Sequence, residues 1–238
     1  MDTTSPSPGA NGSGRWLLYG ANGYTGRLIA EEAVSRGLSP VLGGRSADSI
    51  IPLANALGCE HRIFPLDNPD TVAASLDGMS VVLHCAGPFA STADPMIEAC
   101  LRAGVHYMDI DGEIPVLESI FARHEQARER GIALLPGSGF DVVPTDCLAL
   151  MLKEQMPDAT NLRLAMGGKV ALSPGTFKVT LETIPRSGTI REDGALRAVP
   201  HAWKMETVAF DDTKRCTITI PWGDVSTAWR STGIPNIR

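Results

Sequence analysis

Three glycines recur at a spacing of three residues in the stretch YGANGYTGR, residues 19–27. Gly20 would allow a tight turn, Gly23 would let the backbone approach a pyrophosphate, and Gly26 would let a following helix pack close to a sheet. A helix that begins here would direct free N–H groups and a partial positive charge at phosphates. We therefore expect a dinucleotide site, the alternative being a turn that binds nothing. The candidate cofactor contacts are Gly20, Asn22, Gly23, Tyr24, Thr25 and Gly26.

The stretch GGRS, residues 43–46, lies about 20 residues further on, where dinucleotide sites distinguish NAD from NADP. A site for NAD would place an acid here for the ribose hydroxyls, but no acid occurs before Asp48. Arg45 can instead pair with a 2′-phosphate through its planar fork, and Ser46 can add a hydroxyl donor. The pattern predicts NADP(H) in preference to NAD(H), unless Arg45 only solvates the start of a helix.

Two further stretches could contact the same cofactor. Asp67 follows a third apolar run, where a carboxylate can accept from the adenine amine or can instead cap the next helix. A fourth run ends in small residues that would admit the cofactor, followed by two residues that could wall a nicotinamide pocket. These candidates are Ala86, Gly87, Pro88 and Phe89.

Acidic residues alternate in DIDGE, residues 109–113. In an extended segment such acids share a face, and their crowding can raise a pKa and create a proton donor. Glu113 is a catalytic candidate on this ground. The alternative is that Asp111 or Glu113 caps a helix beginning near Ile114.

A second cluster is GSGFDVVPTD, residues 137–146. Its glycines free the backbone, so that Phe140 could stack near a nicotinamide and Asp141 could position a substrate or water. The alternative is a linker with a helix cap supplied by Thr145 or Asp146.

Other chemistries lack their signatures. No tyrosine is followed by Lys four residues on, and no G-x-S-x-G elbow occurs, which disfavours short-chain reductases and serine hydrolases. The five histidines have no ligand spacing, so we expect no metal site. We expect His106 and Tyr107 to be core residues.

The elements that must position these residues alternate between apolar runs and helical patterns. This alternation predicts an α/β fold, a Rossmann-type doubly wound parallel sheet with helices on both faces. The predicted strands are 16–20, 40–44, 61–66, 80–87, 105–110 and 132–136, and the predicted helices are 25–36, 47–57, 69–76, 92–103 and 114–130.

The pattern changes after residue 139, and we expect a second, smaller α+β domain. It should contain a helix at 145–156, strands at 162–168 and 216–222, a mixed segment at 174–187 and a hairpin at 188–199. A polar stretch, 224–233, then leads to IPNIR without a closing element. The expected divisions are a disordered tail (1–14), a dinucleotide-binding domain (15–145) and a partial substrate or oligomerisation domain (146–238).

Composition narrows the class of protein. The 238 residues are 43% hydrophobic with a net charge of −6, unlike a basic nucleic-acid-binding surface. No apolar run approaches the ~18 residues that span a bilayer, and the first fourteen residues lack a secretory signal. Five cysteines without C-x-x-C spacing favour a reducing cytoplasm. A homodimer is possible.

Several stretches together resemble the NADP-binding half of saccharopine dehydrogenase-like oxidoreductases, in the branch that includes bacterial trans-acting enoyl reductases. They cover about residues 15–150 and are YGANGYTGRLIA, VLGGRS, VVLHCAGPFA, YMDIDGE and PGSGFDVVPTD. Later stretches such as SPGTFKVTLE also look like this branch. Asp111 departs from it, since related sequences tend to carry a hydroxyl or apolar residue there.

The resemblance implies hydride transfer between NADPH and a small-molecule or acyl substrate, either an imine or an enoyl-type compound. A non-catalytic NADP-binding sensor is the alternative. The family's chain normally continues well past Arg238, so we expect this sequence to be C-terminally incomplete.

Overall fold

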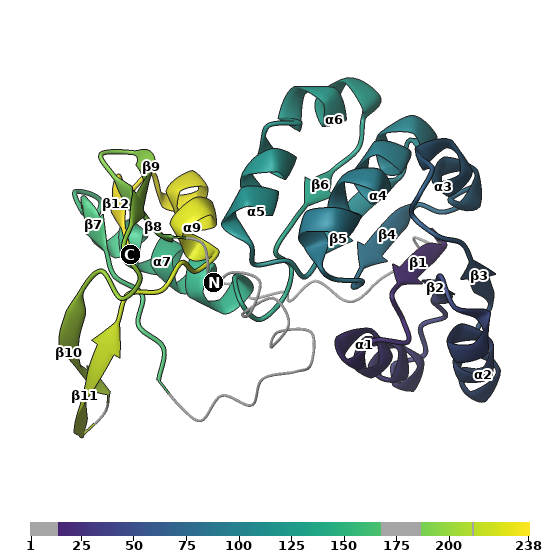
Figure 1. Cartoon of the computed structure of the whole chain (residues 1–238), viewed down its shortest axis with the longest axis horizontal. Helices are drawn as coiled ribbons and strands as arrows, with labels where there is room; N and C mark the ends of the chain where they lie inside the picture. Colours follow the sequence, from purple (N-terminus) through teal and green to yellow (C-terminus); the bar gives the residue numbers. More distant parts are fainter. Residues whose placement is uncertain (1–13, 168–186, 211) are drawn as a thin grey trace, which may run out of the picture.

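The structure is a computed structural model that describes residues 14–167, 187–210 and 212–238. The expected N-terminal tail, except Gly14, and most of the mixed segment at 174–187 lie outside these residues. The described chain forms a larger part built on a parallel sheet and a smaller part built on mixed strands (Figure 1).

Six parallel strands form the larger sheet in the order β3-β2-β1-β4-β5-β6. The chain order reverses between β1 and β4, which places a switch point beside the first strand. This arrangement confirms the predicted doubly wound fold. The strands are β1 (Trp16–Tyr19), β2 (Val41–Gly44), β3 (His61–Ile63), β4 (Val81–His84), β5 (His106–Asp109) and β6 (Leu134–Leu135).

Helices cover both faces of this sheet (Figure 1). Alternate residues of β1 serve the two faces, because side chains alternate along a strand. Leu18 joins a buried cluster with Ile50 of α2, whereas Leu17 joins another with Met96 of α4. The helices are α1 (Tyr24–Ser35), α2 (Ala47–Leu57), α3 (Pro69–Ser75), α4 (Phe89–Ala103), α5 (Ile114–Phe121) and α6 (His124–Arg130).

The single helix predicted at 114–130 is wrong, since the chain forms α5 and α6 with a break at residues 122–123. The apolar pattern that packs α5 on the core ends at Phe121, and α6 buries only Ala127. Two predicted strands also end three residues early, at Ile63 and His84.

The smaller part contains a sheet in the order β7-β12-β8-β9 and a separate hairpin, β10–β11. Ala149, Leu162, Ala228 and Ile237 pack in its core. Its elements are α7 (Val143–Gln155), β7 (Asn161–Leu162), β8 (Gly188–Glu192), β9 (Ala195–Val199), β10 (Met205–Phe210), β11 (Thr213–Ile218), α9 (Asp224–Thr232) and β12 (Asn236–Ile237).

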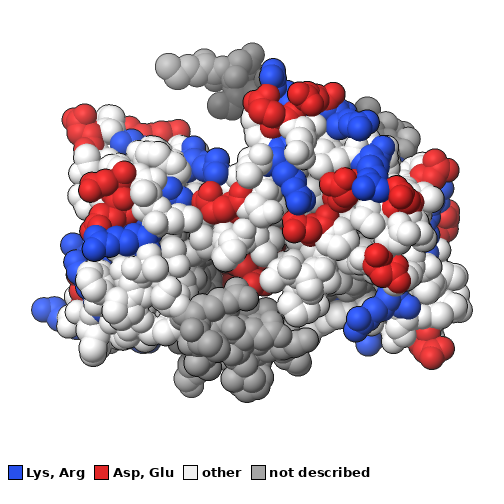
Figure 2. Space-filling model, turned by 45° about the horizontal axis from the view of Figure 1, so that its top comes forward, with Lys and Arg blue, Asp and Glu red and all other residues white. Residues whose placement is uncertain are grey.

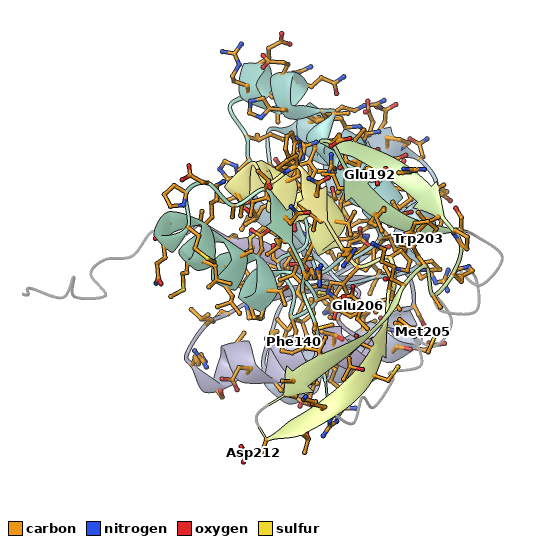
Figure 3. The ribbon with its side chains drawn as sticks, turned by 90° about the vertical axis from the view of Figure 1, so that its left-hand side faces the viewer. Phe140, Glu192, Trp203, Met205, Glu206 and Asp212 are labelled. Carbon is orange, nitrogen blue, oxygen red and sulfur yellow. The ribbon has the colours of Figure 1, made fainter. Side chains whose placement is uncertain are left out.

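The β10–β11 hairpin projects from the molecule with Asp212 at its tip (Figure 3). Glu206 holds its base, accepting hydrogen bonds from Arg163 (3.3 Å) and Arg238 (2.6 Å). Basic and acidic side chains are interspersed over the face shown in Figure 2. None of the helices in the described ranges combines the length and apolar character needed to cross a membrane.

The sequence predicted this part less well. The hairpin around Asp193-Gly194 is confirmed, with positive φ at both residues. However, the strand predicted at 162–168 covers only 161–162, and the strand predicted at 216–222 is β11, paired with the unpredicted β10. The polar stretch 224–233 is helix α9, and IPNIR contains β12, an inner strand of the sheet.

Glu118 of α5 joins the two parts of the described chain. Its carboxylate accepts from Arg191 Nη2 (3.1 Å), Ser226 Oγ (2.6 Å) and Arg230 Nη2 (3.2 Å). Arg191 is 6% exposed and also donates to the carbonyls of Val225 and Gly194. Polar contacts with α5 therefore bury a polar helix, which explains why an apolar pattern does not reveal α9.

Replacing Glu118 with Ala should lower the free energy of unfolding by about 3 kcal/mol, because the buried Arg191 would lose its charged partner. Urea unfolding measures the change. The control is Glu125→Ala, which removes an exposed pair with Arg128 and should cost less than about 1 kcal/mol. Equal losses in the two variants would contradict a joining role for Glu118.

Candidate functional site

The turn between β1 and α1 is closed so tightly that only glycine fits. Gly20 has φ of +85°, and a Cβ there would lie 2.7 Å from the Ala86 nitrogen. A Cβ on Gly26 would lie 2.2 Å from the Gly20 oxygen. Gly23 precedes α1 in an extended conformation, and no described side chain caps the helix. The first N–H groups of α1 are thus left for an anion.

The ends of three strands meet at this turn. The Gly20 amide donates to the Gly43 oxygen at the end of β2 (2.8 Å), and the Cys85 amide donates to the Tyr19 oxygen (2.8 Å). Asn22 lies beside β2, since a Cβ on Gly44 would be 3.4 Å from its Oδ1. The structure therefore brings the glycine stretch, GGRS and the turn after β4 to one edge of the sheet.

Arg45 and Asp67 both lie close enough to Tyr19 to influence the pKa of its hydroxyl. Burial raises the pKa of Tyr19 to about 12, while Arg45 lowers it and Asp67 raises it. Arg45 is exposed and forms no ion pair with a described residue. Ser46 directly precedes α2, with its Oγ 3.4 Å from that of Ser49. The capping alternative for Asp67 is wrong, because Asn68 caps α3 by accepting from Asp70 N (2.9 Å).

The turn after β4 holds the next four candidates. Ala86, Gly87 and Pro88 form the turn, and Phe89 begins α4. Phe89 is half-buried, and its ring packs edge-on against His84 with 5.4 Å between centroids. Of the four, Ala86 lies directly beside Gly20, since a Cβ on Gly20 would lie 2.7 Å from its nitrogen and 2.9 Å from its Cα.

Asp109, at the end of β5, organises the first acidic cluster. It is fully buried and accepts from Tyr107 Oη (2.7 Å), Asp111 N (3.0 Å) and Gly137 N (2.7 Å). Tyr107 is thus a core residue, as expected, but His106 is exposed and accepts from Ala133 N (2.9 Å). The sequence pattern predicted no separate role for Asp109.

Asp111 is 1% exposed, and its Oδ1 accepts from Glu113 N (3.0 Å). Burial, together with the neighbouring Asp109 and Glu113, raises the pKa of Asp111 to about 8. Asp111 therefore carries a proton at neutral pH. Glu113 precedes α5 but does not cap it with its side chain.

The second acidic cluster adjoins the first. A Cβ on Gly112 would lie 3.5 Å from Asp141 Oδ2, so the Asp141 carboxylate lies beside this glycine. Burial raises the pKa of Asp141, and Trp222 donates to its backbone oxygen (2.5 Å). Phe140 is 79% exposed (Figure 3).

Asp224 is a further acid beside the two acidic clusters, and the sequence did not point to it. It begins α9 and is 1% exposed. Burial raises its pKa to about 6, and Asp146 and Asp141 raise it as well. Its place depends on the fold of α9, so no local pattern pointed to it. Among the described residues, no three His, Cys, Asp or Glu side chains gather as metal ligands do, and all five cysteines are free.

The described sequence matches known proteins over both parts. Residues 16–135 match the family model described as the saccharopine dehydrogenase NADP-binding domain. A saccharopine dehydrogenase-like oxidoreductase of Mus musculus is 32% identical over 206 residues, which are 74% of this chain and 47% of that protein. A trans-acting enoyl reductase of Mycobacterium leprae (strain TN) is 35% identical over 138 residues, 55% of this chain and 33% of that protein.

A solved structure shows the same fold. Apo histidine-tagged saccharopine dehydrogenase (L-Glu forming) from Saccharomyces cerevisiae superimposes with a TM-score of 0.60 at 12% identity. The match covers 86% of this chain and 49% of that chain. This chain thus spans less than half the length of the curated relatives described above.

Asp111→Asn should change how stability depends on pH. Between the unfolded value of about 4 and the folded pKa of about 8, the native state binds more protons at Asp111, so native stability falls as pH rises. Asn retains an acceptor for Glu113 N without a charge. At pH 9 we expect the free energy of unfolding of the variant to exceed that of the wild type by more than about 1.4 kcal/mol, which corresponds to one pKa unit.

Urea unfolding at pH 5, 7 and 9 measures this difference. Asp48→Asn, at an exposed acid of α2, is the control and should leave the pH dependence unchanged. A constant difference between Asp111→Asn and wild type across the three pH values would contradict a buried, protonated Asp111.

Proposed function

Because this chain belongs to the saccharopine dehydrogenase family through its NADP-binding domain, we propose that it is an NADP-dependent oxidoreductase. The observation that carries the proposal is the contact between Gly26 and the Gly20 oxygen, where even a methyl group would clash. It brings the open end of α1 against the switch point of the sheet, the usual place for a dinucleotide.

The residues around this turn fit NADP(H) in order along the sheet edge. The first amides of α1, from Tyr24, Thr25 and Gly26, would hold the pyrophosphate beside Gly20, Asn22 and Gly23. Arg45 and Ser46 would hold the 2′-phosphate, which is why we propose NADP(H) in preference to NAD(H). Asp67 would face the adenine.

The turn after β4 and the loop after β6 would enclose the other end of the cofactor. Ala86, Gly87, Pro88 and Phe89 would line it, with Phe140 opposite. A bound nicotinamide supplies the hydride chemistry, and the protein supplies orientation and a proton. We propose Asp141 and Glu113 as catalytic residues, because both belong to the acidic clusters at this end of β5 and β6. Burial raises the pKa of Asp141, which favours a proton donor.

The surroundings favour an enoyl-type acyl substrate over an amino-acid imine. Among the described residues, no Lys or Arg is a leading cause of the pKa shifts of Asp111, Asp141 or Asp224, whereas a polycarboxylate substrate would need cationic partners. Phe140 and, on α7, Val143 and Leu148 expose apolar side chains. A cytoplasmic location and a homodimer stay predictions from the sequence.

Arg45→Ala should raise the Kd for NADPH about tenfold or more and change the Kd for NADH less than about twofold, since only NADPH carries the 2′-phosphate. Fluorescence titration with each nucleotide measures both values. Arg36→Ala, at an exposed arginine directly after α1 that pairs with Glu32, is the matched control. Equal weakening for the two nucleotides would refute this account of cofactor choice.

Asp141→Asn should reduce turnover about 100-fold or more, the usual loss when a general acid is removed, with the Kd for NADPH unchanged. NADPH oxidation with enoyl thioesters and with imines of amino acids measures turnover. Asp158→Asn, at an exposed acid after α7, should have no effect. NADPH binding without oxidation by any of these substrates would favour a sensor over an enzyme.

A further inference from the structure

β4 ends in a histidine that no part of the proposed reaction uses. His84 is 0% exposed and is surrounded by the rings of Tyr19, Phe89 and Tyr107, at centroid distances of 5.6, 5.4 and 6.1 Å. Its Nε2 lies 3.1 Å from Thr92 Oγ1 in the first turns of α4. Its Nδ1 is buried and has no hydrogen-bond partner among the described residues.

The hydrogen bonds of Thr92 determine which nitrogen of His84 carries the proton. Thr92 Oγ1 lies 2.6 Å from the Ala86 oxygen and 3.1 Å from the Pro88 oxygen. Both carbonyls can only accept, so the single hydroxyl proton of Thr92 is donated to them. Thr92 must then accept from His84, which requires the tautomer with hydrogen on Nε2. Burial lowers the pKa of His84 to about 3, so the ring stays neutral at physiological pH.

The chain of hydrogen bonds ends on the turn that touches the glycine stretch. Ala86 receives the bond from Thr92, and its amide nitrogen would lie 2.7 Å from a Cβ on Gly20. A displacement of Ala86 would therefore widen or close the space beside Gly20. An unpartnered Nδ1 in an apolar environment is destabilising, so an apolar side chain would suit this position better if packing alone mattered.

We infer that His84 is a positioning residue, whose Nε2–H, acting through the Thr92 hydroxyl, holds the 85–88 turn against Gly20 and so sets the affinity for the dinucleotide. The inference deepens the proposed function and rests on it for the identity of the ligand. It assigns to His84 no contact with the cofactor. The hydrogen-bond chain itself is a property of the free protein and can be tested without a ligand.

The tautomer is tested first, in the ligand-free protein. Nitrogen-15 chemical shifts of the His84 ring should show hydrogen on Nε2 and a bare Nδ1, unchanged between pH 5 and 8. Hydrogen on Nδ1, or titration in this range, would overturn the inference whatever the fate of the proposed function.

The effect on the ligand site is tested with matched pairs of variants. Gln can place a donor where His84 has Nε2, whereas Asn can place one only near Nδ1; Ser keeps the hydroxyl of Thr92, whereas Val does not. His84→Asn and Thr92→Val should each raise the Kd for NADPH about tenfold, and His84→Gln and Thr92→Ser should stay within about threefold of wild type. His84→Asn with Thr92→Val should be no weaker than either alone, because both break one chain.

Thermal unfolding identifies any variant that does not fold, and the Thr92 pair then carries the test if His84→Asn fails. His124→Asn, at an exposed histidine of α6, should bind NADPH as wild type does. If the wild type binds NADPH and all variants bind it with the same Kd, the role of His84 is overturned and the proposed function is not affected. Wild type that binds neither NADPH nor NADH would overturn the proposed function and, with it, the role of His84 in affinity.

Discussion

The arrangement of the candidate site depends on the hydrogen bonds that the Asp109 carboxylate accepts. It is buried at the end of β5 and accepts from a side chain of its own strand, from Asp111 N and from Gly137 N across the sheet. The Asp109 backbone oxygen also accepts from Ser138 N (2.7 Å). Both loops that carry candidate catalytic residues are thus attached to one residue. Burial raises the pKa of Asp109 while these hydrogen bonds lower it, so the donors stabilise the ionised form against the cost of burial.

The glycine turn, which is the end proposed for the nucleotide, depends on close backbone approach instead. Gly20, Gly26 and the turn after β4 approach so closely that the two connections facing the switch point form one packed unit. Such contacts tolerate little adjustment, because a protein interior has few voids into which a displaced backbone can move. The two ends of this sheet edge are therefore held differently. Side-chain hydrogen bonds hold the acidic loops, whereas close backbone packing, which leaves no room for a side chain, holds the glycine turn.

The sequence was informative where the determinants are local. Gly20, Gly23 and Gly26 lie within one turn and one helix start, and the strands around them read as continuous apolar runs because both faces of the sheet are covered. It failed where stability comes from distant polar contacts. Ser226 and Glu118 are separated by 108 residues, so no local sequence pattern around α9 indicates that its polar residues are buried.

The residues of the candidate site also differ in whether a local sequence pattern could point to them. Glu113, Phe140 and Asp141 were selected from residue type and from their places after a strand, and their roles stay predictions. The role of Asp109 could not be predicted in this way, since it depends on Gly137, 28 residues away in the chain. Asp224 joins the acidic clusters only because Gly223, which precedes it, packs against the Gly112 oxygen, where a Cβ would lie at 3.2 Å.

The position of β12 has a consequence for the order in which the chain acquires its structure on the ribosome. β12 lies between β7 and β8, with Asn236 opposite Asn161 and Ile237 opposite Arg191. All six strands of the parallel sheet are synthesised before α7, so the larger part can form co-translationally as a unit. The mixed sheet lacks its inner strand β12 until residues 236–237 leave the ribosomal exit tunnel. Until then β7 and β8 have unpaired edges, which are sites for wrong strand pairing.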